Sequence, residues 1–351
     1  MFKEYEKCEL CPRKCGVDRR KAVGFCCVGA EPLVARAALH MWEEPCVSGK
    51  EGSGTVFFAG CTLGCVFCQN AAISRVNENR AGHLTADTAQ DAEIPRPTEN
   101  RSERRPADTA QNAEISRETS IAPKNSTAVG KIISADRLSE IFLELQGKGA
   151  NNINLVTPTM FYPHVIAAVH AAREKGLNIP ILCNTGGYEL PETVEKLAGT
   201  IDIWMPDFKY LDPKLSLKYS RAADYSVFAK ASLKKMVSLV PRAEYDERGM
   251  MRRGVIVRHL LLPGCLAESK RVLDYLFAEY GNEIVYSLMS QYTPTAALDR
   301  EKFPSLSRRV TTYEYDRLID HALSLGITNA YTQYGKPAKE SFIPDFDGTG
   351  V

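Results

Sequence analysis

The chain has 351 residues, of which 44% are hydrophobic and 25% charged, so it can bury a core of ordinary size. Its 44 Lys and Arg residues nearly balance 43 Asp and Glu residues, and the net charge of +1 argues against a nucleic-acid partner bound through bulk charge. The sequence has no apolar run that could span a bilayer, and its charged first ten residues predict no secretory signal. We therefore expect a cytoplasmic protein with no membrane partner.

Cysteine is unevenly distributed along the chain. Nine of the 11 cysteines lie within the first 68 residues. The total is too low for a small protein held together by disulfides, and it is odd. Tight spacing without an export signal favours thiolate metal ligands in a reducing compartment.

Residues 1–50 are predicted to form a cysteine-rich N-terminal metal-binding element. Four thiolates suit a structural zinc ion and an auxiliary iron–sulfur cluster equally well, and the spacing does not separate the two. The expected ligands are Cys8, Cys11, Cys15 and Cys26, with Cys27 as the competitor of Cys26.

Beyond this element, short apolar runs alternate with amphipathic stretches, as in proteins with parallel sheets. The predicted strands are Thr55–Phe58, Asn152–Val156, Pro180–Asn184, Ile201–Met205, Gly254–Leu261 and Ile284–Met289. One predicted helix begins after the capping residue Ser134. Four others cover roughly 161–175, 226–240, 267–280 and 312–325.

Six strand–helix units imply an α/β fold with a parallel sheet and right-handed crossovers. They are too few for a full eight-stranded barrel, and no Gly-rich dinucleotide motif follows the first strand. The sequence predicts a partial (β/α)6 barrel over 51–335 with a small cysteine-rich N-terminal element. A doubly wound sheet is the alternative.

Residues 77–130 interrupt this pattern. Glu78–Thr98 and Glu99–Thr119 form a direct repeat that is identical at 13 of 21 positions. Each unit has too few apolar residues to bury a core, which predicts a disordered insertion in a surface loop. Residues 336–351 are predicted to be a C-terminal tail.

The first predicted strand is followed by the segment GCTLGCVFCQN, which contains Cys61, Cys65 and Cys68. A closed zinc site normally has four ligands, so a three-cysteine zinc site would need a distant fourth ligand. Three sulfurs on one loop suit a 4Fe-4S cluster instead, because each sulfur binds one iron and the fourth iron has no protein ligand. An open iron can bind a chelating group directly.

Cys61-x3-Cys65-x2-Cys68, with Phe67 before the last cysteine, resembles the motif of radical S-adenosylmethionine enzymes. The surrounding SGKEGSGTVFFAGC and CQN segments resemble those of the pyruvate formate-lyase activating enzyme group, and more closely its uncharacterised relatives with an N-terminal cysteine cluster. The resemblance covers about residues 8–76 and 131–335.

This resemblance implies an activity and its cofactors. The enzymes cleave S-adenosylmethionine reductively at a 4Fe-4S cluster, and the resulting 5′-deoxyadenosyl radical abstracts hydrogen from a substrate. It implies a one-electron donor of the flavodoxin or ferredoxin type. The substrate would be a protein, a peptide or a small molecule.

The resemblance also implies cofactor contacts at the ends of the predicted strands, which form the active face of barrels. Thr157 and Thr159 occupy the place of a Gly-Gly-Glu-like segment that holds the methionyl amine, so hydroxyl or carbonyl acceptors would replace a carboxylate. Asn184 begins an NTGG segment similar to an Asp-Thr-Asn-Gly segment near the ribose and a monovalent cation. The missing Asp puts that cation in doubt.

Further contacts are implied on the next strands. Asp207 and Lys209 resemble an Asp-x-Lys whose lysine faces the cofactor carboxylate. Arg258 interrupts an apolar run and resembles a fifth-strand arginine; as a charge in a buried strand it needs a partner. Gln291 follows the sixth strand and is expected to reach adenine or substrate. His259 alternates to the other face, as a hydrogen-bonded core histidine would.

The remaining features have plainer interpretations. The segment Trp42-Glu43-Glu44-Pro45 is expected to be a solvated turn, although its carboxylates could also ligate or cap. The other cysteines, Cys46, Cys183 and Cys265, are expected to act as small hydrophobic residues. The competing functional hypothesis is a non-catalytic zinc or iron–sulfur module that contacts RNA or a protein.

Overall fold

A computed structural model of the chain describes residues 2–76, 129–295, 298–333 and 344–351. These residues belong to one compact unit. The repeats at 78–119, and nearly all of the predicted insertion at 77–130, lie outside the described residues. Among the helices described, none is long and apolar enough to cross a membrane.

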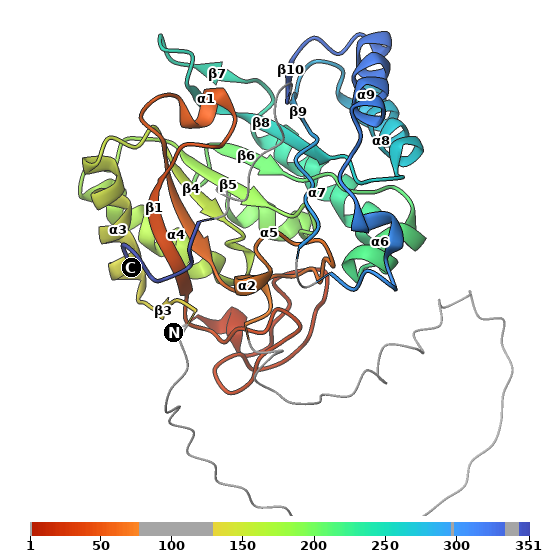
Figure 1. The fold of residues 1–351 in the computed structure, drawn as a ribbon. Coiled ribbons are helices and arrows are strands. Elements are labelled where there is room, and N and C mark those ends of the chain that lie inside the picture. The colour runs from red at the N-terminus through yellow and green to blue at the C-terminus, as the bar shows by residue number, and fades with distance from the viewer. Residues whose placement is uncertain (1, 77–128, 296–297, 334–343) are drawn as a thin grey trace, which may run out of the picture. The chain divides into compact units, whose positions relative to one another are not determined.

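The unit is built on a ten-stranded, mostly parallel sheet with helices packed against it, so the protein has an α/β fold (Figure 1). The strand order is β10-β9-β8-β6-β5-β4-β2-β1-β3, with β7 paired to β8. The strands are β1 Leu33–His40, β2 Ser53–Phe58, β3 Lys131–Ile132, β4 Ile153–Val156, β5 Ile181–Thr185, β6 Ile203–Pro206, β7 Glu244–Tyr245, β8 Met251–Leu260, β9 Val285–Met289 and β10 Ala330–Thr332.

Seven strands from β2 to β10 pair in parallel and follow one another along the sheet in sequence order, with β3 and β7 outside this series. A doubly wound sheet requires a point where the strand order reverses. The parallel strands that the structure describes contain no such point, so the doubly wound alternative is wrong. Their carboxyl ends all lie at one edge of the sheet, side by side.

The helices connect these strands and cover the sheet, as Figure 1 shows for α3 and α4 near β1 and for α8 and α9 near β9. Ser134 caps α3 by accepting a hydrogen bond from the backbone N–H of Arg137, and Thr311 and Glu314 form a capping box on α9. The helices are α1 Pro45–Ser48, α2 Ala71–Ser74, α3 Ala135–Gly147, α4 Tyr162–Glu174, α5 Pro191–Lys196, α6 Pro213–Ser220, α7 Tyr225–Leu239, α8 Leu266–Tyr280 and α9 Thr312–Leu325, and the short 3-10 turns are Lys3–Tyr5, Thr159–Phe161 and Pro304–Ser307.

All six predicted strands and all five predicted helices are present, with small differences at their ends. The prediction of six parallel strands is wrong, because β10 adds a seventh. Sequence patterns also missed β1, which lies inside the segment 1–50 and pairs antiparallel with β2 as a strand of the main sheet. Its sequence LVARAALH is rich in alanine and contains Arg36, so it has no strong strand pattern.

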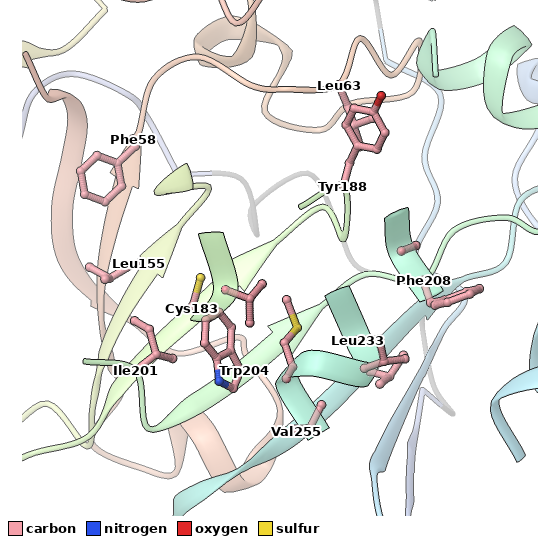
Figure 2. Packing of buried hydrophobic residues seen from close by; sticks show 14 of the residues in the cluster. Phe58, Leu63, Leu155, Cys183, Tyr188, Ile201, Trp204, Phe208, Leu233 and Val255 are labelled. Carbon is pink, nitrogen blue, oxygen red and sulfur yellow. The ribbon is translucent and has the colours of Figure 1, made fainter. Parts of the chain in front are cut away.

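Both faces of the sheet are buried, which explains the nearly continuous apolar runs of its strands. On the helix-covered face, Phe58, Leu155, Cys183, Trp204 and Val255 pack together with helix side chains (Figure 2). The opposite face has a second cluster, in which Cys46 and Val47 of α1 pack against strand residues. These strand residues include Leu182, Ile203, Met205, Ile256 and Val285.

The burial of Cys46 and Cys183 confirms that they act as small hydrophobic residues, whereas Cys265 is only half-buried. Part of the predicted tail packs on the sheet. The backbone N–H of Gly348 donates to the carbonyl of Ala35, and the N–H of Ala37 donates to the carbonyl of Thr349. The last residues therefore lie along β1.

Candidate metal and cofactor site

The three-cysteine loop begins directly after β2 and is held by its neighbours on both sides. Gly60 has a φ of +87°, and a Cβ there would come within 2.8 Å of the carbonyl oxygen of Cys26. On the other side, the backbone N–H of Gly64 donates to the carbonyl of Ser220 at 3.2 Å, and the Cys65 thiol lies 3.0 Å from the Ser220 hydroxyl. Glycine at position 60 is thus needed for both conformation and close approach.

Cys61, Cys65 and Cys68 all line one cavity of about 560 Å³. Burial raises the pKa of each thiol, for Cys68 to about 11, and the neighbouring thiols raise the pKa values of Cys61 and Cys68 further. Thiolates at these positions therefore need a cation beside them. A metal bound by the three sulfurs would supply such a charge.

The arrangement of the described side chains also bears on the kind of metal. No three His, Cys, Asp or Glu side chains among them converge on a point where one metal ion could sit. Three cysteines bound to separate irons of a cubane stand further apart than three ligands of one ion. Three soft sulfur donors around one cavity are the ligand type that both iron–sulfur clusters and zinc take.

Most residues predicted to contact the cofactor line the same cavity. The members of the predicted set found there are Phe67, Thr157, Asn184, Asp207, Lys209, Arg258 and Gln291, together with the three cysteines. They come from the carboxyl ends of β2, β4, β5, β6, β8 and β9 and from the segments that follow these strands. The sequential strand order brings these ends together.

Thr159 is the exception, because it is buried outside this lining. Its hydroxyl donates to Glu189 Oε1 at 2.7 Å, and the hydroxyl of Thr185 donates to the same oxygen. Burial raises the pKa of Glu189 to about 7, against the lowering effect of these two hydrogen bonds. The structure gives Thr159 a partner inside the protein and does not bring it to the cavity.

Thr157 and Asn184 are linked through the backbone. Thr157 has a φ of +58°, a conformation that is uncommon for a residue other than glycine. Its N–H donates to the carbonyl of Asn184 at 2.8 Å. This hydrogen bond holds the end of β4 in a turn beside β5 at the cavity.

Asp207 and Lys209 form an ion pair at the end of β6. Burial alone would lower the pKa of Lys209, but Asp207 and Cys65 raise it well above its ordinary value, so the ammonium stays charged. The ammonium lies 6.0 Å from the ring centre of Phe67, on the cysteine loop. Asp207 therefore holds the Lys209 ammonium close to the cysteine loop.

Arg258 is paired with two glutamates that sequence reasoning placed wrongly in a solvated turn. The side chains of Glu43 and Glu44 are only 8% and 5% exposed, and both accept hydrogen bonds from the Arg258 guanidinium. Burial would lower the pKa of Arg258, but both carboxylates raise it, and Arg258 in turn lowers the pKa of Glu44.

The side chains of Glu43 and Glu44 are buried because Pro45 starts a helix whose apolar residues pack against the sheet, as described for Cys46 and Val47. Glu43 also accepts a hydrogen bond from Asn154 Nδ2 at 2.8 Å. The only sequence signal was indirect: an arginine in a buried strand requires a carboxylate from elsewhere in the chain. No sequence pattern near Glu43 and Glu44 identified them as the partners of Arg258.

His259 lies on the other face of β8, 2% exposed, and its Nδ1 lies 2.7 Å from the carbonyl oxygen of Phe208. Burial lowers the pKa of this imidazole, so it is neutral. It is a buried core histidine bonded at one nitrogen, as predicted. It does not line the cavity.

The N-terminal cysteines gather in a second place, next to the cysteine loop. Burial raises the pKa of Cys11 to about 12, and Cys15 and Cys26 contribute to this shift. Cys8 and Cys15 likewise raise the pKa of Cys26. The four predicted ligands are therefore within electrostatic range of one another.

The turn that carries Cys26 and Cys27 gives each thiol a backbone carbonyl as partner. Cys27 has a φ of +64°, and its thiol donates to the carbonyl of Phe25 at 3.4 Å, while the Cys26 thiol donates to the carbonyl of Val28 at 4.0 Å. Cys26 therefore stays the predicted fourth ligand, with Cys27 as its competitor.

Comparison with known proteins gives one distant relative and no family. No protein-family model matches the chain. The chain is similar to "Uncharacterized protein MJ0674" of Methanocaldococcus jannaschii, with 25% identity over 321 residues. The alignment covers 91% of this chain and 75% of the relative. The likeness thus extends over nearly the whole chain, but the relative is itself described as uncharacterized.

Proposed function

We propose that this protein is a radical S-adenosylmethionine enzyme that abstracts hydrogen from a substrate. The observation that carries the proposal is the convergence of Cys61, Cys65 and Cys68 with seven other predicted side chains on one cavity. We also infer that the open, sequentially ordered sheet forms a partial barrel around this cavity, with the cysteine-rich segment packed beside it.

The three thiolates would hold a 4Fe-4S cluster, and a reduced cluster supplies the electron that cleaves S-adenosylmethionine to a 5′-deoxyadenosyl radical. The other roles belong to side chains of this chain. Lys209, held by Asp207, would bind the carboxylate of the methionyl group. The carbonyl or hydroxyl of Thr157 and the amide of Asn184 would accept hydrogen bonds from its amine and from the ribose.

Apolar side chains would protect the reaction. Leu63, Val156, Leu260 and Met289 line the cavity between the polar groups. A radical that abstracts hydrogen must be kept from water and from other hydrogen donors, and apolar walls do this. Gln291 stands at the end of β9, where it would meet adenine or the substrate.

The proposal includes two further expectations. A flavodoxin or ferredoxin would supply electrons one at a time, and the substrate is a protein, a peptide or a small molecule. The N-terminal cysteines would hold a second metal, zinc or an auxiliary iron–sulfur cluster. Both sets of thiolates require a reducing compartment, so we place the protein in the cytoplasm.

The test is anaerobic reconstitution of the full chain with iron and sulfide, followed by reduction in the presence of S-adenosylmethionine. We expect a brown protein that forms 5′-deoxyadenosine. Cys61→Ala should abolish this cleavage, whereas Cys183→Ala, which also removes a buried thiol, should keep it, because Cys183 packs on the helix-covered face. A colourless protein that contains only zinc and cleaves nothing would instead favour a non-catalytic metal-binding module.

A further inference from the structure

One wall of the cavity is aromatic. His40 at the end of β1, Trp42 just after it and Phe57 on β2 all line the cavity. The rings of His40 and Phe57 meet edge to face, with their centres 6.1 Å apart. Trp42 is 61% exposed. None of the three belongs to the residues assigned to the cofactor.

Glu43 lies next to this wall and also lines the cavity. One of its oxygens accepts a hydrogen bond from Asn154 and the other accepts one from Arg258. An ionised carboxylate offers about four acceptor positions on its two oxygens. Glu43 therefore keeps acceptor capacity for a further donor.

The charges around the cavity do not balance. Among the residues that the structure describes around the cavity, Lys209 pairs with Asp207, and the single charge of Arg258 is shared by Glu43 and Glu44, which leaves one carboxylate charge in excess. Burial lowers the pKa of His40, so this imidazole adds no positive charge at neutral pH. A buried excess charge is costly unless a counter-charge accompanies it.

We propose that His40, Trp42, Phe57 and Glu43 form a substrate subsite that binds an organic cation, an ammonium or guanidinium group. This inference rests on the proposed function and adds the chemical class of the substrate. Aromatic ring faces attract cations, and the carboxylate supplies the counter-charge and an acceptor. An anionic group would be repelled by Glu43, and an apolar group would leave its charge uncompensated.

The binding test needs neither iron nor reductant. Trp42 and Trp204 are the two tryptophans of the chain, and Trp204 is only 1% exposed in the core. A ligand that contacts Trp42 should therefore change the exposed part of the fluorescence. We expect Nα-acetyl-lysine amide or Nα-acetyl-arginine amide to quench it saturably. Nα-acetyl-norleucine amide, a neutral analogue, should not.

Calorimetry with variants locates the subsite. Trp42→Leu should weaken cation binding about tenfold and Trp42→Phe much less, because the phenyl ring keeps part of the cation–π attraction. Glu43→Gln should weaken binding about tenfold or more, because the counter-charge is lost. Glu51→Gln is the matched control: Glu51 is an exposed carboxylate of the neighbouring segment that does not line the cavity, so binding should not change.

A further titration tests whether the subsite binds a lysine side chain within a peptide. The tripeptide Ala-Lys-Ala, blocked at both ends, should bind at least as tightly as Nα-acetyl-lysine amide, and loss of binding to the tripeptide would overturn a peptide substrate. Trp42 is exposed, so its variants should fold even if Glu43→Gln disturbs Arg258.

Equal binding of the norleucine and lysine amides would overturn the inference. So would displacement of the lysine amide by S-adenosylmethionine, because the excess charge would then serve the cofactor's sulfonium. Cation binding should be the same in Cys61→Ala as in the unchanged chain. If it is, failure of S-adenosylmethionine cleavage would count against the proposed function and leave the subsite standing.

Discussion

Arg258 and Glu44 are 214 positions apart in the sequence and form a forked ion pair beneath the cavity. Arg258 Nε donates to Glu44 Oε1 at 2.8 Å, and Nη2 donates to Oε2 at 2.7 Å. Both side chains are buried, so the pair ties α1 and the segment before it to β8. Replacing either side chain should therefore change the free energy of unfolding.

Removing either partner of this pair should destabilise the protein, the arginine more than the glutamate. Arg258→Met should lower the free energy of unfolding by about 3–5 kcal/mol, because it leaves the buried Glu44 carboxylate without its partner, whereas Glu44→Gln should cost less, because Arg258 keeps its ion pair with Glu43. The double variant should lose clearly less than the sum of the two. Urea unfolding of all three variants measures this coupling, and strictly additive losses would contradict a direct contact.

The N-terminal cysteines should differ in their importance for metal binding. In a chain in which Cys61, Cys65 and Cys68 are replaced by alanine, we expect Cys26→Ser to lose the remaining bound metal and Cys27→Ser to keep it. The Cys26 thiol lies within electrostatic range of Cys8 and Cys15, and the Cys27 thiol bonds to the carbonyl of Phe25. Elemental analysis measures the result and identifies zinc or iron. Metal loss in Cys27→Ser alone would reverse the assignment.

Phe25 joins the N-terminal element to the three-cysteine loop. The guanidinium carbons of Arg13 and Arg75 lie 3.8 Å and 4.5 Å from the centre of its ring. Arg13 Nε also donates to the carbonyl of Thr62 at 2.9 Å, within that loop. We expect Phe25→Leu to lower the free energy of unfolding by about 1–2 kcal/mol and to reduce the iron retained after reconstitution.

The control for this change is Phe2→Leu in the same element. Phe2 packs on His164 rather than on the three-cysteine loop. It should therefore cost stability without loss of iron. Equal iron loss in both variants would point to general loosening of the element.

His164 on α4 should make stability depend on pH. Its Nδ1 lies 2.9 Å from the Tyr5 hydroxyl, and burial and Arg19 lower its pKa to about 4 from an ordinary 6.5. Between these values the unfolded chain binds more protons than the folded one, so stability falls as the pH falls. We expect this group to contribute about 2 kcal/mol of loss from pH 7 to pH 4.

Urea unfolding at both pH values should show a flatter dependence for His164→Gln than for the unchanged protein. Glu31 lies 3.6 Å from the other imidazole nitrogen and would favour the protonated ring. Its replacement in Glu31→Gln should therefore steepen the dependence. An unchanged slope in both variants would show that His164 does not titrate in this window.

Local patterns were enough to predict six strands, five helices and the three-cysteine loop. Periodicity and capping act over a few residues, so Ser134 and the apolar run at Asn152–Val156 carry their own information. The contacts expected at Asn184, Lys209 and Arg258 were implied by the family resemblance, and these residues also lie at or near the ends of predicted strands. Parallel strands bring such ends together whatever the details of packing.

Contacts between distant segments could not be predicted in this way. Glu43 and Glu44 looked like part of a polar turn, and only the packing of α1 under the sheet buries them against Arg258. Thr159 stood in the right segment, but Glu189 takes its hydroxyl away from the cavity. Strand β1 forms because β2 offers it backbone partners.

Cysteine spacing and hydrophobic periodicity can be read from the sequence, because each pattern involves residues that are close together in the chain. The α/β fold and the donor set of the three-cysteine loop could therefore be inferred from the amino-acid sequence by itself. Which carboxylates face the cavity, and what charge they leave in it, depends on pairs of residues far apart in the chain. Folding decides those pairs, because a buried charge takes whichever partner the packing of the whole unit brings within reach.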